Sequence, residues 1–361
     1  MEKYRVGIVG ATGMVGQRFI SLLKDHPWFE VNCVAASARS AGKTYREAVG
    51  ERWAFSWEIP EKVAGMTVVD AADIDEVSKH VDFVFCAVDM KKDEIRALEE
   101  AYAKHEIPVV SNNSACRGIE DVPMVVPEIN ADHLAVIEAQ KKRLDTKNGF
   151  IAVKPNCSIQ SYVPALTPLL DFEPEKVSVC TYQAISGAGK TFKTWPEMVD
   201  NVIPYIGGED EKSENEPLKL WGHVEDGKIV NATLPVISAQ GLRGACSDGH
   251  MAAVSVSFKK KPTIEQIKER WANYETEAQR LELPSAPKPF LQYFEDPSRP
   301  QTRLDRDFQN GFGVSIGRLR EDKLFDYRFV CLSHNTVRGA AGGGILTAEL
   351  LCRKGYIPHR V

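Results

Sequence analysis

Short apolar runs alternate with amphipathic segments over the first 150 residues of the chain. The runs that fit buried strands are residues 4–10, 29–37, 81–88 and 107–113. The segments at 14–25 and 91–105 place apolar side chains at helical spacing. Such alternation is typical of a parallel sheet with helices on both faces. The pattern therefore predicts an α/β fold that begins with a parallel-sheet domain.

The pattern changes from about residue 176 onward. Longer mixed runs at 176–185, 251–259 and 326–334 indicate longer strands. They predict a second, α+β domain with a more antiparallel sheet. The acidic stretch GGEDEKSENEP at 207–217 is expected to form a polar loop between elements of this domain.

Composition and charge narrow the class of protein. The chain has 361 residues, of which 43% are hydrophobic and 26% charged, and its net charge is −5. Its lysines and arginines are scattered, which argues against nucleic acid and favours a small-molecule partner. No run approaches the roughly 18 apolar residues of a membrane span, and the first residues lack the apolar core of a signal peptide. We therefore expect a soluble, cytoplasmic protein without a membrane partner.

A glycine motif, GIVGATGMVG, joins the first predicted strand to the first predicted helix. Gly10, Gly13 and Gly16 would let the backbone turn tightly and approach a pyrophosphate at the helix N-terminus. The motif predicts a Rossmann-like dinucleotide site, and a glycine turn that serves only packing is the alternative. A second motif, AISGAGKT, is not a phosphate-binding P-loop, because Ala184 stands where that motif needs glycine.

The end of the second predicted strand bears on the choice of cofactor. NAD-selective sites usually place an acidic residue there to accept from the ribose hydroxyl. This chain has AASARSAGK instead, and Ser37, Arg39 and Ser40 could bind a 2′-phosphate. The sequence therefore favours NADP, although Arg39 could also be a solvated loop arginine.

Eight cysteines are spread along the chain without a C-x-x-C pair, and most lie inside apolar runs. This favours reduced, buried thiols and predicts no metal site. Cys157 differs, because in KPNCSIQ it follows the apolar run at 150–153 and precedes a helical segment at 158–170. Amides at the start of a helix lower the pKa of a thiol, and Lys154 would add to that effect. Cys157 is therefore a candidate nucleophile.

A nucleophilic thiol also needs a base close in space. His250, in RGACSDGH, ends a polar turn before a strand and is the first candidate. His334, in CLSHNTVRG, also lies at a strand end and competes for this role. The alternative to both is a packed thiol with a hydrogen-bonded core histidine.

Taken together, these motifs resemble one known family. The Gly10–Gly16 loop, PNCSIQ, ISGAG, ENEPLK, RGACSDGH and NTVRGAAGGGILTAELL occur in this order over nearly the whole chain. In this the chain resembles the aspartate-β-semialdehyde dehydrogenases, especially those of archaea and fungi. The resemblance implies reductive dephosphorylation of L-aspartyl-4-phosphate by NADPH, on the pathway to lysine, threonine and methionine.

The matched motifs also imply roles for individual residues. Cys157 resembles the acyl-accepting nucleophile, His250 the acid/base and Gln183 the residue that orients the acyl group. Arg243 resembles the clamp on the substrate α-carboxylate, a planar group that suits a guanidinium fork. The substrate residues implied by the resemblance are Arg117 and Lys219, which would bind phosphate, Glu216, which would bind the amino group, and Arg243. The cofactor residues so implied are Gly10, Thr12, Gly13, Met14, Val15, Ser37, Arg39, Ser40, Ser186, Gly187 and Asn335.

One position departs from the family pattern. The family commonly has Asn-Pro-Asn-Cys, and this chain has lysine at the first of these positions, Lys154. The nucleophile stays in place, but the local electrostatics change. Three alternatives stay open: a malonyl-CoA reductase that uses Cys157 on a thioester, an N-acetylglutamyl-phosphate reductase, and a non-catalytic NADP-binding sensor.

The domain boundaries and the assembly are further expectations. Residues 1–156 with 336–361 would form the dinucleotide-binding domain, and residues 157–335 the catalytic and dimerisation domain. Apolar strands on a sheet that needs covering, together with the resemblance, predict a homodimer or a homotetramer built from dimers.

Overall fold

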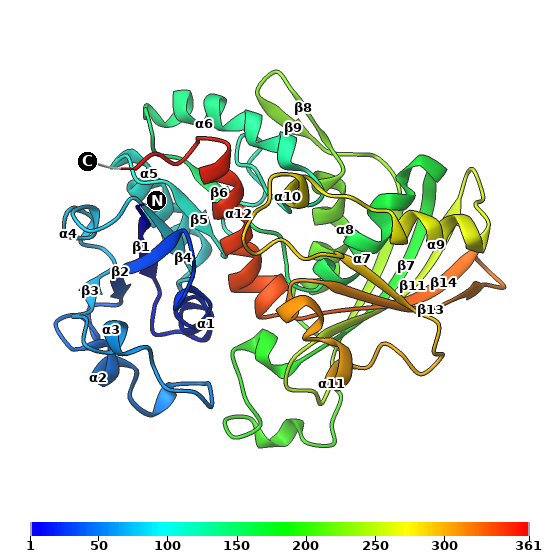
Figure 1. Cartoon of the computed structure of the whole chain (residues 1–361), viewed down its shortest axis with the longest axis horizontal. Coiled ribbons are helices and arrows are strands. Elements are labelled where there is room, and N and C mark those ends of the chain that lie inside the picture. The colour runs from blue at the N-terminus through cyan, green and yellow to red at the C-terminus, as the bar shows by residue number, and fades with distance from the viewer. Residues whose placement is uncertain (1, 360–361) are drawn as a thin grey trace.

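Six parallel strands form the first sheet of the computed structural model, which describes residues 2–359 (Figure 1). Their order is β3-β2-β1-β4-β5-β6. The strands are β1 (Tyr4–Val9), β2 (Phe29–Ala36), β3 (Val69–Asp70), β4 (Phe83–Cys86), β5 (Val109–Ser111) and β6 (Ile151–Val153). This is the doubly wound order, in which ligands bind beyond the carboxyl ends of the strands where the winding reverses, here between β1 and β4. The predicted parallel sheet is confirmed.

Helices cover both faces of this sheet. On one face, α1 (Met14–Leu23) buries Phe19 and Ile20 in a cluster with Phe85 and with Ile345 of α12 (Gly342–Arg353). On the other face, α5 (Lys92–Lys104) buries Tyr102 beside α6 (Ile137–Leu144). Three short helices lie near the β2 and β3 end, namely α2 (Tyr45–Val49), α3 (Glu61–Ala64) and α4 (Ile74–Ser78). The helices predicted at 14–25 and 91–105 are confirmed to within two residues.

The second sheet is mixed, with the order β10-β7-β11-β14-β13-β12. Its strands are β7 (Pro174–Gln183), β10 (Val236–Arg243), β11 (His250–Phe258), β12 (Leu291–Phe294), β13 (Val314–Glu321) and β14 (Tyr327–Ser333). The pairs of β11 with β7 and β14 are antiparallel, as is the pair of β13 with β14. The strands at the two edges pair in parallel with their neighbours. The predicted α+β domain is confirmed.

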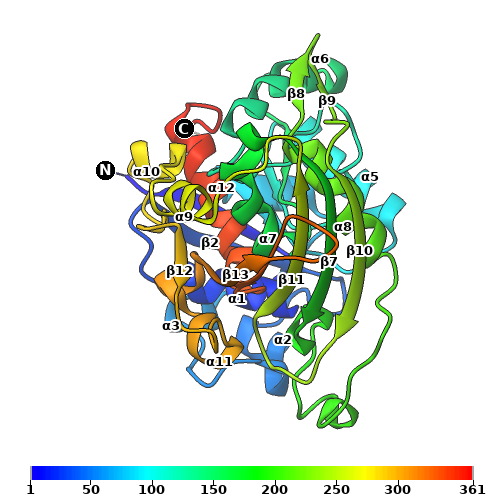
Figure 2. The same ribbon diagram turned by 90° about the vertical axis from the view of Figure 1, so that its right-hand side faces the viewer.

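Within residues 2–359, helices cover one face of the second sheet and leave the other uncovered. On this inner face, α7 (Ile159–Leu166) packs against β11, β13 and β14, and α9 (Ile264–Ala272) packs near β12. Figure 2 looks onto the other face, where β10, β7 and β11 lie in front of α7 with no helix drawn over them. Tyr182 and Val236 are 44% and 63% exposed, respectively. The short elements of this half are β8 (His223–Glu225), β9 (Lys228–Val230), α10 (Glu277–Arg280) and α11 (Thr302–Asp305).

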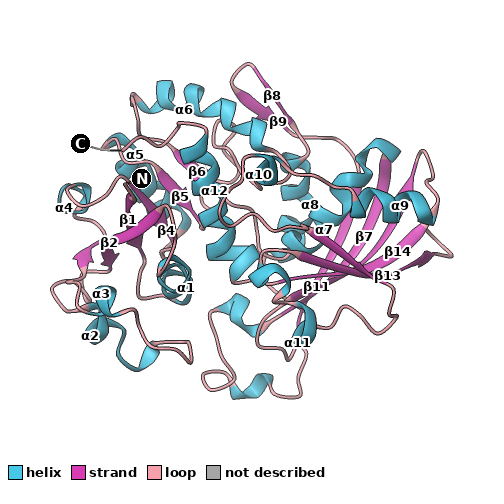
Figure 3. Ribbon diagram, in the orientation of Figure 1, coloured by secondary structure: helices cyan, strands magenta, loops and turns pink. Residues whose placement is uncertain are grey.

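The acidic stretch at 207–217 was expected to be a polar loop, and that prediction is wrong. Helix α8 (Glu209–Leu220) occupies most of it (Figure 3). It packs against β10. Acidic side chains in the first turn favour a helix because they face the positive end of its dipole. Glu209 and Lys219 are buried, so these polar residues are held by tertiary contacts that the local sequence does not show.

Among residues 2–359, no helix combines the length and the apolar character that crossing a bilayer requires.

Candidate active site

Cys157 lies in the turn between β6 and α7, where the two sheets meet. Its side chain is partly exposed, and α7 begins two residues later. The helical turn Val337–Ala341, which precedes α12 near the end of the chain, packs against Cys157. A Cβ atom at Gly339 would lie 2.8 Å from Cys157 Cβ, so only glycine allows this approach. The thiol is therefore held in a tightly packed position.

The partner of Cys157 is His250, the first residue of β11. Its Nε2 lies 3.4 Å from Cys157 Sγ, and the imidazole is completely buried. Nδ1 accepts the backbone N–H of Ala184 at 3.0 Å. The neutral ring therefore carries its proton on Nε2 and presents it to the sulfur. Burial, with Arg243 as the next cause, holds the pKa of His250 well below its ordinary value, so the ring is neutral at pH 7.

His334, the competing candidate, faces another set of groups. Its Nδ1 lies 3.3 Å from the backbone nitrogen of Thr336, and its Nε2 lies 3.7 Å from an Asp307 carboxylate oxygen. It makes no described contact with Cys157. Of the two candidates, His250 is therefore the one that lies against Cys157.

The thiol of Cys157 does not have the lowered pKa that its place before a helix predicted. Burial raises its pKa above the ordinary value, and the charge of Glu209 adds to this. Lys154, Arg117 and Arg243 oppose the shift without reversing it. Desolvation of the thiolate therefore outweighs the nearby cations.

Gln183 and Arg243 end neighbouring strands beside His250. They are paired residues of β7 and β10, and both are buried. Gln183 Nε2 donates to Glu209 Oε2 at 3.1 Å. Arg243 Nη1 donates to the carbonyl oxygen of Ala184 at 2.7 Å. The N–H of the same residue, Ala184, donates to His250 Nδ1. The predicted catalytic and carboxylate-binding residues are thus brought together.

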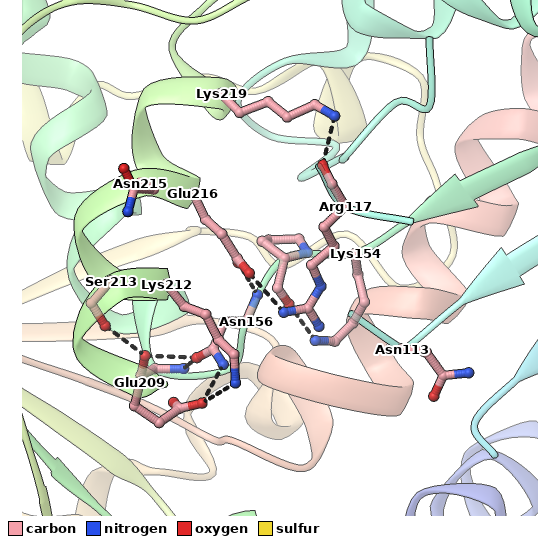
Figure 4. Close-up of polar contacts among 12 residues, drawn as sticks. Asn113, Arg117, Lys154, Asn156, Glu209, Lys212, Ser213, Asn215, Glu216 and Lys219 are labelled. Carbon is pink, nitrogen blue, oxygen red and sulfur yellow. Dashed lines mark hydrogen bonds and ion pairs between the residues drawn. The ribbon is translucent and has the colours of Figure 1, made fainter. Parts of the chain in front are cut away.

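Two carboxylates of α8 hold the segment before Cys157 (Figure 4). Glu209 Oε1 accepts from Asn156 Nδ2 at 2.9 Å and from Lys212 Nζ at 2.7 Å. Glu216 accepts the backbone N–H of Asn156 at 2.5 Å and Arg117 Nη1 at 2.8 Å. The sequence analysis missed Glu209 and Asn156. Asn156 stands directly before the nucleophile in PNCS, which could have drawn attention to it, whereas Glu209 has no local signal.

A cavity of about 540 Å³ lies at the carboxyl ends of β1, β2 and β4. Its lining includes the predicted cofactor residues Gly10, Thr12, Gly13, Ser37, Arg39 and Ser40. Gly10 has a φ of +91°, and a Cβ there would lie 2.3 Å from the carbonyl oxygen of Ala87. The first amides of α1 have no side-chain cap, so they can bind an anion. The sequence missed Lys43 and Arg52, which line the same cavity.

These features fit a dinucleotide with a 2′-phosphate. Free amides at the start of α1 suit its pyrophosphate, and the exposed Arg39, with Lys43, suits the added phosphate. The side chain of Val15 packs against the core, so its backbone amide is the group that can contact the dinucleotide.

A smaller cavity of about 170 Å³ joins the two halves of the protein. Met14 and Ser186, both predicted cofactor residues, line it together. Asn335 Nδ2 donates to Ser186 Oγ at 2.9 Å, and its Oδ1 accepts the N–H of Gly249 at 2.8 Å. Gly187 lies against the His250 imidazole. Residues predicted to bind the cofactor thus extend from this cavity to the His250 imidazole.

Two family models identify the class of protein as the semialdehyde dehydrogenases. Residues 5–137 match the semialdehyde dehydrogenase NAD-binding domain, and residues 166–338 match its dimerisation domain. The chain is 44% identical over 359 residues to aspartate-semialdehyde dehydrogenase of Schizosaccharomyces pombe, covering 98% of this chain and 99% of that protein. It is 42% identical over 357 residues to the Archaeoglobus fulgidus enzyme, covering 98% and 100%. The chain belongs to the aspartate-semialdehyde dehydrogenase family.

A solved structure extends this likeness to the fold. Aspartate-semialdehyde dehydrogenase with NADP from Candida albicans superposes with a TM-score of 0.88 at 38% identity. The match covers 99% of this chain and 100% of that one. The resemblance drawn from the motifs is confirmed.

Proposed function

We propose that the protein is an NADP-dependent aspartate-semialdehyde dehydrogenase, which converts L-aspartyl-4-phosphate and NADPH to L-aspartate-4-semialdehyde, phosphate and NADP. The observation that carries the proposal is the Cys157–His250 pair, 3.4 Å apart, at the meeting of a dinucleotide domain and a mixed-sheet domain. Relatives with this name match nearly the full length of the chain. The malonyl-CoA, N-acetylglutamyl-phosphate and sensor alternatives have no comparable support.

In the first half-reaction, Cys157 Sγ forms a bond to the acyl carbon. The bond from that carbon to the phosphate oxygen breaks, and the oxygen keeps the electron pair. Thiol and acyl phosphate dianion become thioester and hydrogen phosphate dianion, so the thiol proton ends on phosphate. We assign Arg243, which lies near His250, to the substrate α-carboxylate, and Glu216 to the substrate amino group.

In the second half-reaction, bound NADPH supplies the hydride that reduces the thioester carbon to the aldehyde. The carbon–sulfur bond breaks, and sulfur leaves as the thiolate, which takes up one proton from solvent to restore the Cys157 thiol, so one turnover consumes one NADPH and one proton. The Nε2–H of His250 can donate a hydrogen bond first to the carbonyl oxygen, as negative charge develops there, and then to the departing sulfur, while the ring keeps its proton. Gln183 and Asn156, tied through Glu209, would keep the acyl group oriented.

The direct test is NADP reduction by the wild-type protein with aspartate semialdehyde. We expect turnover that requires inorganic phosphate and saturates with it, because phosphate must release the thioester. Coenzyme A should not replace phosphate. Turnover with CoA and none with phosphate would assign the protein to the malonyl-CoA reductase class instead.

Arg39→Ala is expected to raise KM for NADP by about tenfold and to leave KM for NAD unchanged. The reason is that a charge-assisted hydrogen bond to the 2′-phosphate is lost. Arg46→Ala is the matched control, since Arg46 is exposed, pairs with exposed Glu61 and does not line the cavity. Equal effects of Arg39→Ala on the two cofactors would remove Arg39 from cofactor selection.

We also propose a cytoplasmic homodimer, or a tetramer of such dimers. The uncovered face of the second sheet, with exposed Tyr182 and Val236, supports this, as does the match to a dimerisation domain. The proposed division at 156/157 and 335/336 agrees with α12 packing beside α1 after the second sheet ends. Sedimentation velocity at micromolar concentration would show a species above the 40.1 kDa of one chain.

A further inference from the structure

One segment of the first domain forms walls of both cavities of the site. This segment, residues 50–58, lies between α2 and α3 and is named the connecting loop (Figure 1). Its Arg52 lines the larger cavity, together with residues of the glycine turn. Its Ala54 and Phe55 line the smaller cavity, together with residues of the second domain. The position of the connecting loop therefore sets part of the shape of both cavities.

The connecting loop is anchored by the side chain of Gln17 on α1. Gln17 Oε1 accepts the backbone N–H of Ala54 at 2.8 Å, and its Nε2 donates to the carbonyl oxygen of Arg52 at 3.1 Å. The same Nε2 donates to the carbonyl oxygen of Thr12, in the glycine turn, at 3.0 Å. Gln17 is 2% exposed, and both hydrogens of its Nε2 are used. One buried amide thus joins the predicted pyrophosphate turn to the loop that forms the cavity walls.

Two neighbouring side chains of α1 hold the outer part of the same loop. Ser21 Oγ accepts Trp57 Nε1–H at 3.1 Å and donates to the carbonyl oxygen of Gln17 at 3.0 Å. The guanidinium carbon of Arg18 lies 4.2 Å from the centre of the Phe55 ring, which is a favourable cation–π distance. Phe55 stacks on Trp57 with 4.8 Å between the ring centres. Trp57 is 48% exposed, so these outer contacts contribute less than those of the buried Gln17.

Gln17 lies behind the cavity walls and is not one of the residues that line them. Its influence on cofactor binding is therefore indirect. Without its three hydrogen bonds, the connecting loop would occupy other positions for part of the time. The affinity for the dinucleotide would then fall with the fraction of molecules whose loop is in place. The Cys157–His250 pair belongs to other elements and would keep its geometry.

We propose that Gln17 is a positioning residue for the cofactor. It fixes the connecting loop against the glycine turn, so that Arg52, Ala54 and Phe55 form preorganised walls for the dinucleotide. This inference rests on the proposed function, in which NADP binds along the two cavities. It assigns a role to residues 50–58, for which no motif gave one.

The test compares Gln17→Met with Gln140→Met as a matched control. Gln140, on α6, is also buried and also bonds only to backbone groups. Its Nε2 donates to the carbonyl oxygens of Asp121 at 3.0 Å and Ile151 at 2.9 Å, and its Oε1 accepts the N–H of Ile151 at 2.6 Å. Gln140 does not line either cavity. Four quantities are measured: Kd for NADPH by fluorescence titration, kcat at saturating NADP, KM for aspartate semialdehyde, and Tm.

We expect Gln17→Met to raise Kd for NADPH by about tenfold or more, because the loop is in place in only a minor fraction of the molecules. At saturating NADP, kcat and KM for aspartate semialdehyde should change by less than about threefold, since bound cofactor restores the loop. Both variants should have a lower Tm, because buried backbone groups lose their partners. Gln140→Met should nevertheless bind NADPH within about twofold of wild type, because its contacts lie away from the cavities.

A wild-type Kd for NADPH in Gln17→Met would overturn the inference. Equal rises in Kd for Gln17→Met and Gln140→Met would also overturn it, since they would reflect a general loss of stability. If Gln17→Met does not fold, Trp57→Phe decides, because it keeps an aromatic ring beside Phe55 and removes only the Nε1–H that binds Ser21. This variant should raise Kd for NADPH by about threefold, and an unchanged Kd would overturn the inference.

The proposed function fails separately from this inference. A wild-type protein that binds NADPH but does not reduce NADP with aspartate semialdehyde and phosphate would overturn the proposed function alone. The Kd values of the two glutamine variants would then still decide the role of Gln17.

Discussion

Replacement of Cys157 by alanine is expected to reduce turnover by a factor of about 10⁴ or more, because no other group can form the thioester. Alanine keeps the backbone of the turn before α7 and fits the space against Gly339, so the fold should persist. The cofactor cavity lies at the ends of β1, β2 and β4 and does not include Cys157, so the affinity for NADPH should stay near that of wild type. Steady-state rates, circular dichroism and NADPH titration measure the three properties.

Cys180→Ala provides the matched control for this prediction. Cys180 is a free, partly exposed thiol on β7, and it makes no contact with His250. We expect wild-type rates from it. Retained activity in Cys157→Ala, or an equal loss in Cys180→Ala, would exclude the covalent mechanism at Cys157.

The second large effect is expected at a buried ion pair. Arg338→Met should lower the free energy of unfolding by about 3–5 kcal/mol, because it leaves the Glu128 carboxylate buried without its partner. Arg338 and Glu128 are 1% and 3% exposed and form a bidentate pair, with 2.8 Å between Nη2 and Oε2. Arg338 Nε also donates to Gln160 of α7 at 3.2 Å. The pair therefore joins the first domain to the elements that position Cys157.

Urea unfolding followed by two spectroscopic probes measures this loss. The double variant Glu128→Leu/Arg338→Met is the informative comparison, since replacing both charges by apolar groups removes the unpaired carboxylate. It should be more stable than Arg338→Met alone. A double variant that loses the sum of the two single effects would show that the pair acts through packing and not through charge.

The sequence by itself determined the features that depend on neighbouring residues. The alternation of runs predicted the parallel sheet, because the helix and strand periods are local properties of the chain. The glycines after the first strand indicated the dinucleotide loop for the same reason: the turn and the start of α1 are built from consecutive residues. Cys157 could be singled out because a strand, a turn and a helix follow one another around it.

Only the tertiary structure determines which charged and polar groups of the site contact one another. Helix α8 could not be recognised in its acidic stretch, because the contacts that allow Glu209 to be buried come from Asn156 and Gln183, which are distant in sequence. That His250 and not His334 lies against Cys157 depends on a tertiary contact between residues 93 positions apart in the sequence. The raised pKa of the Cys157 thiol results from burial, which no motif encodes. The contacts of Lys219 were likewise not readable from its motif, because its Nζ donates to three backbone carbonyl oxygens of residues that lie 97 to 102 positions earlier in the chain.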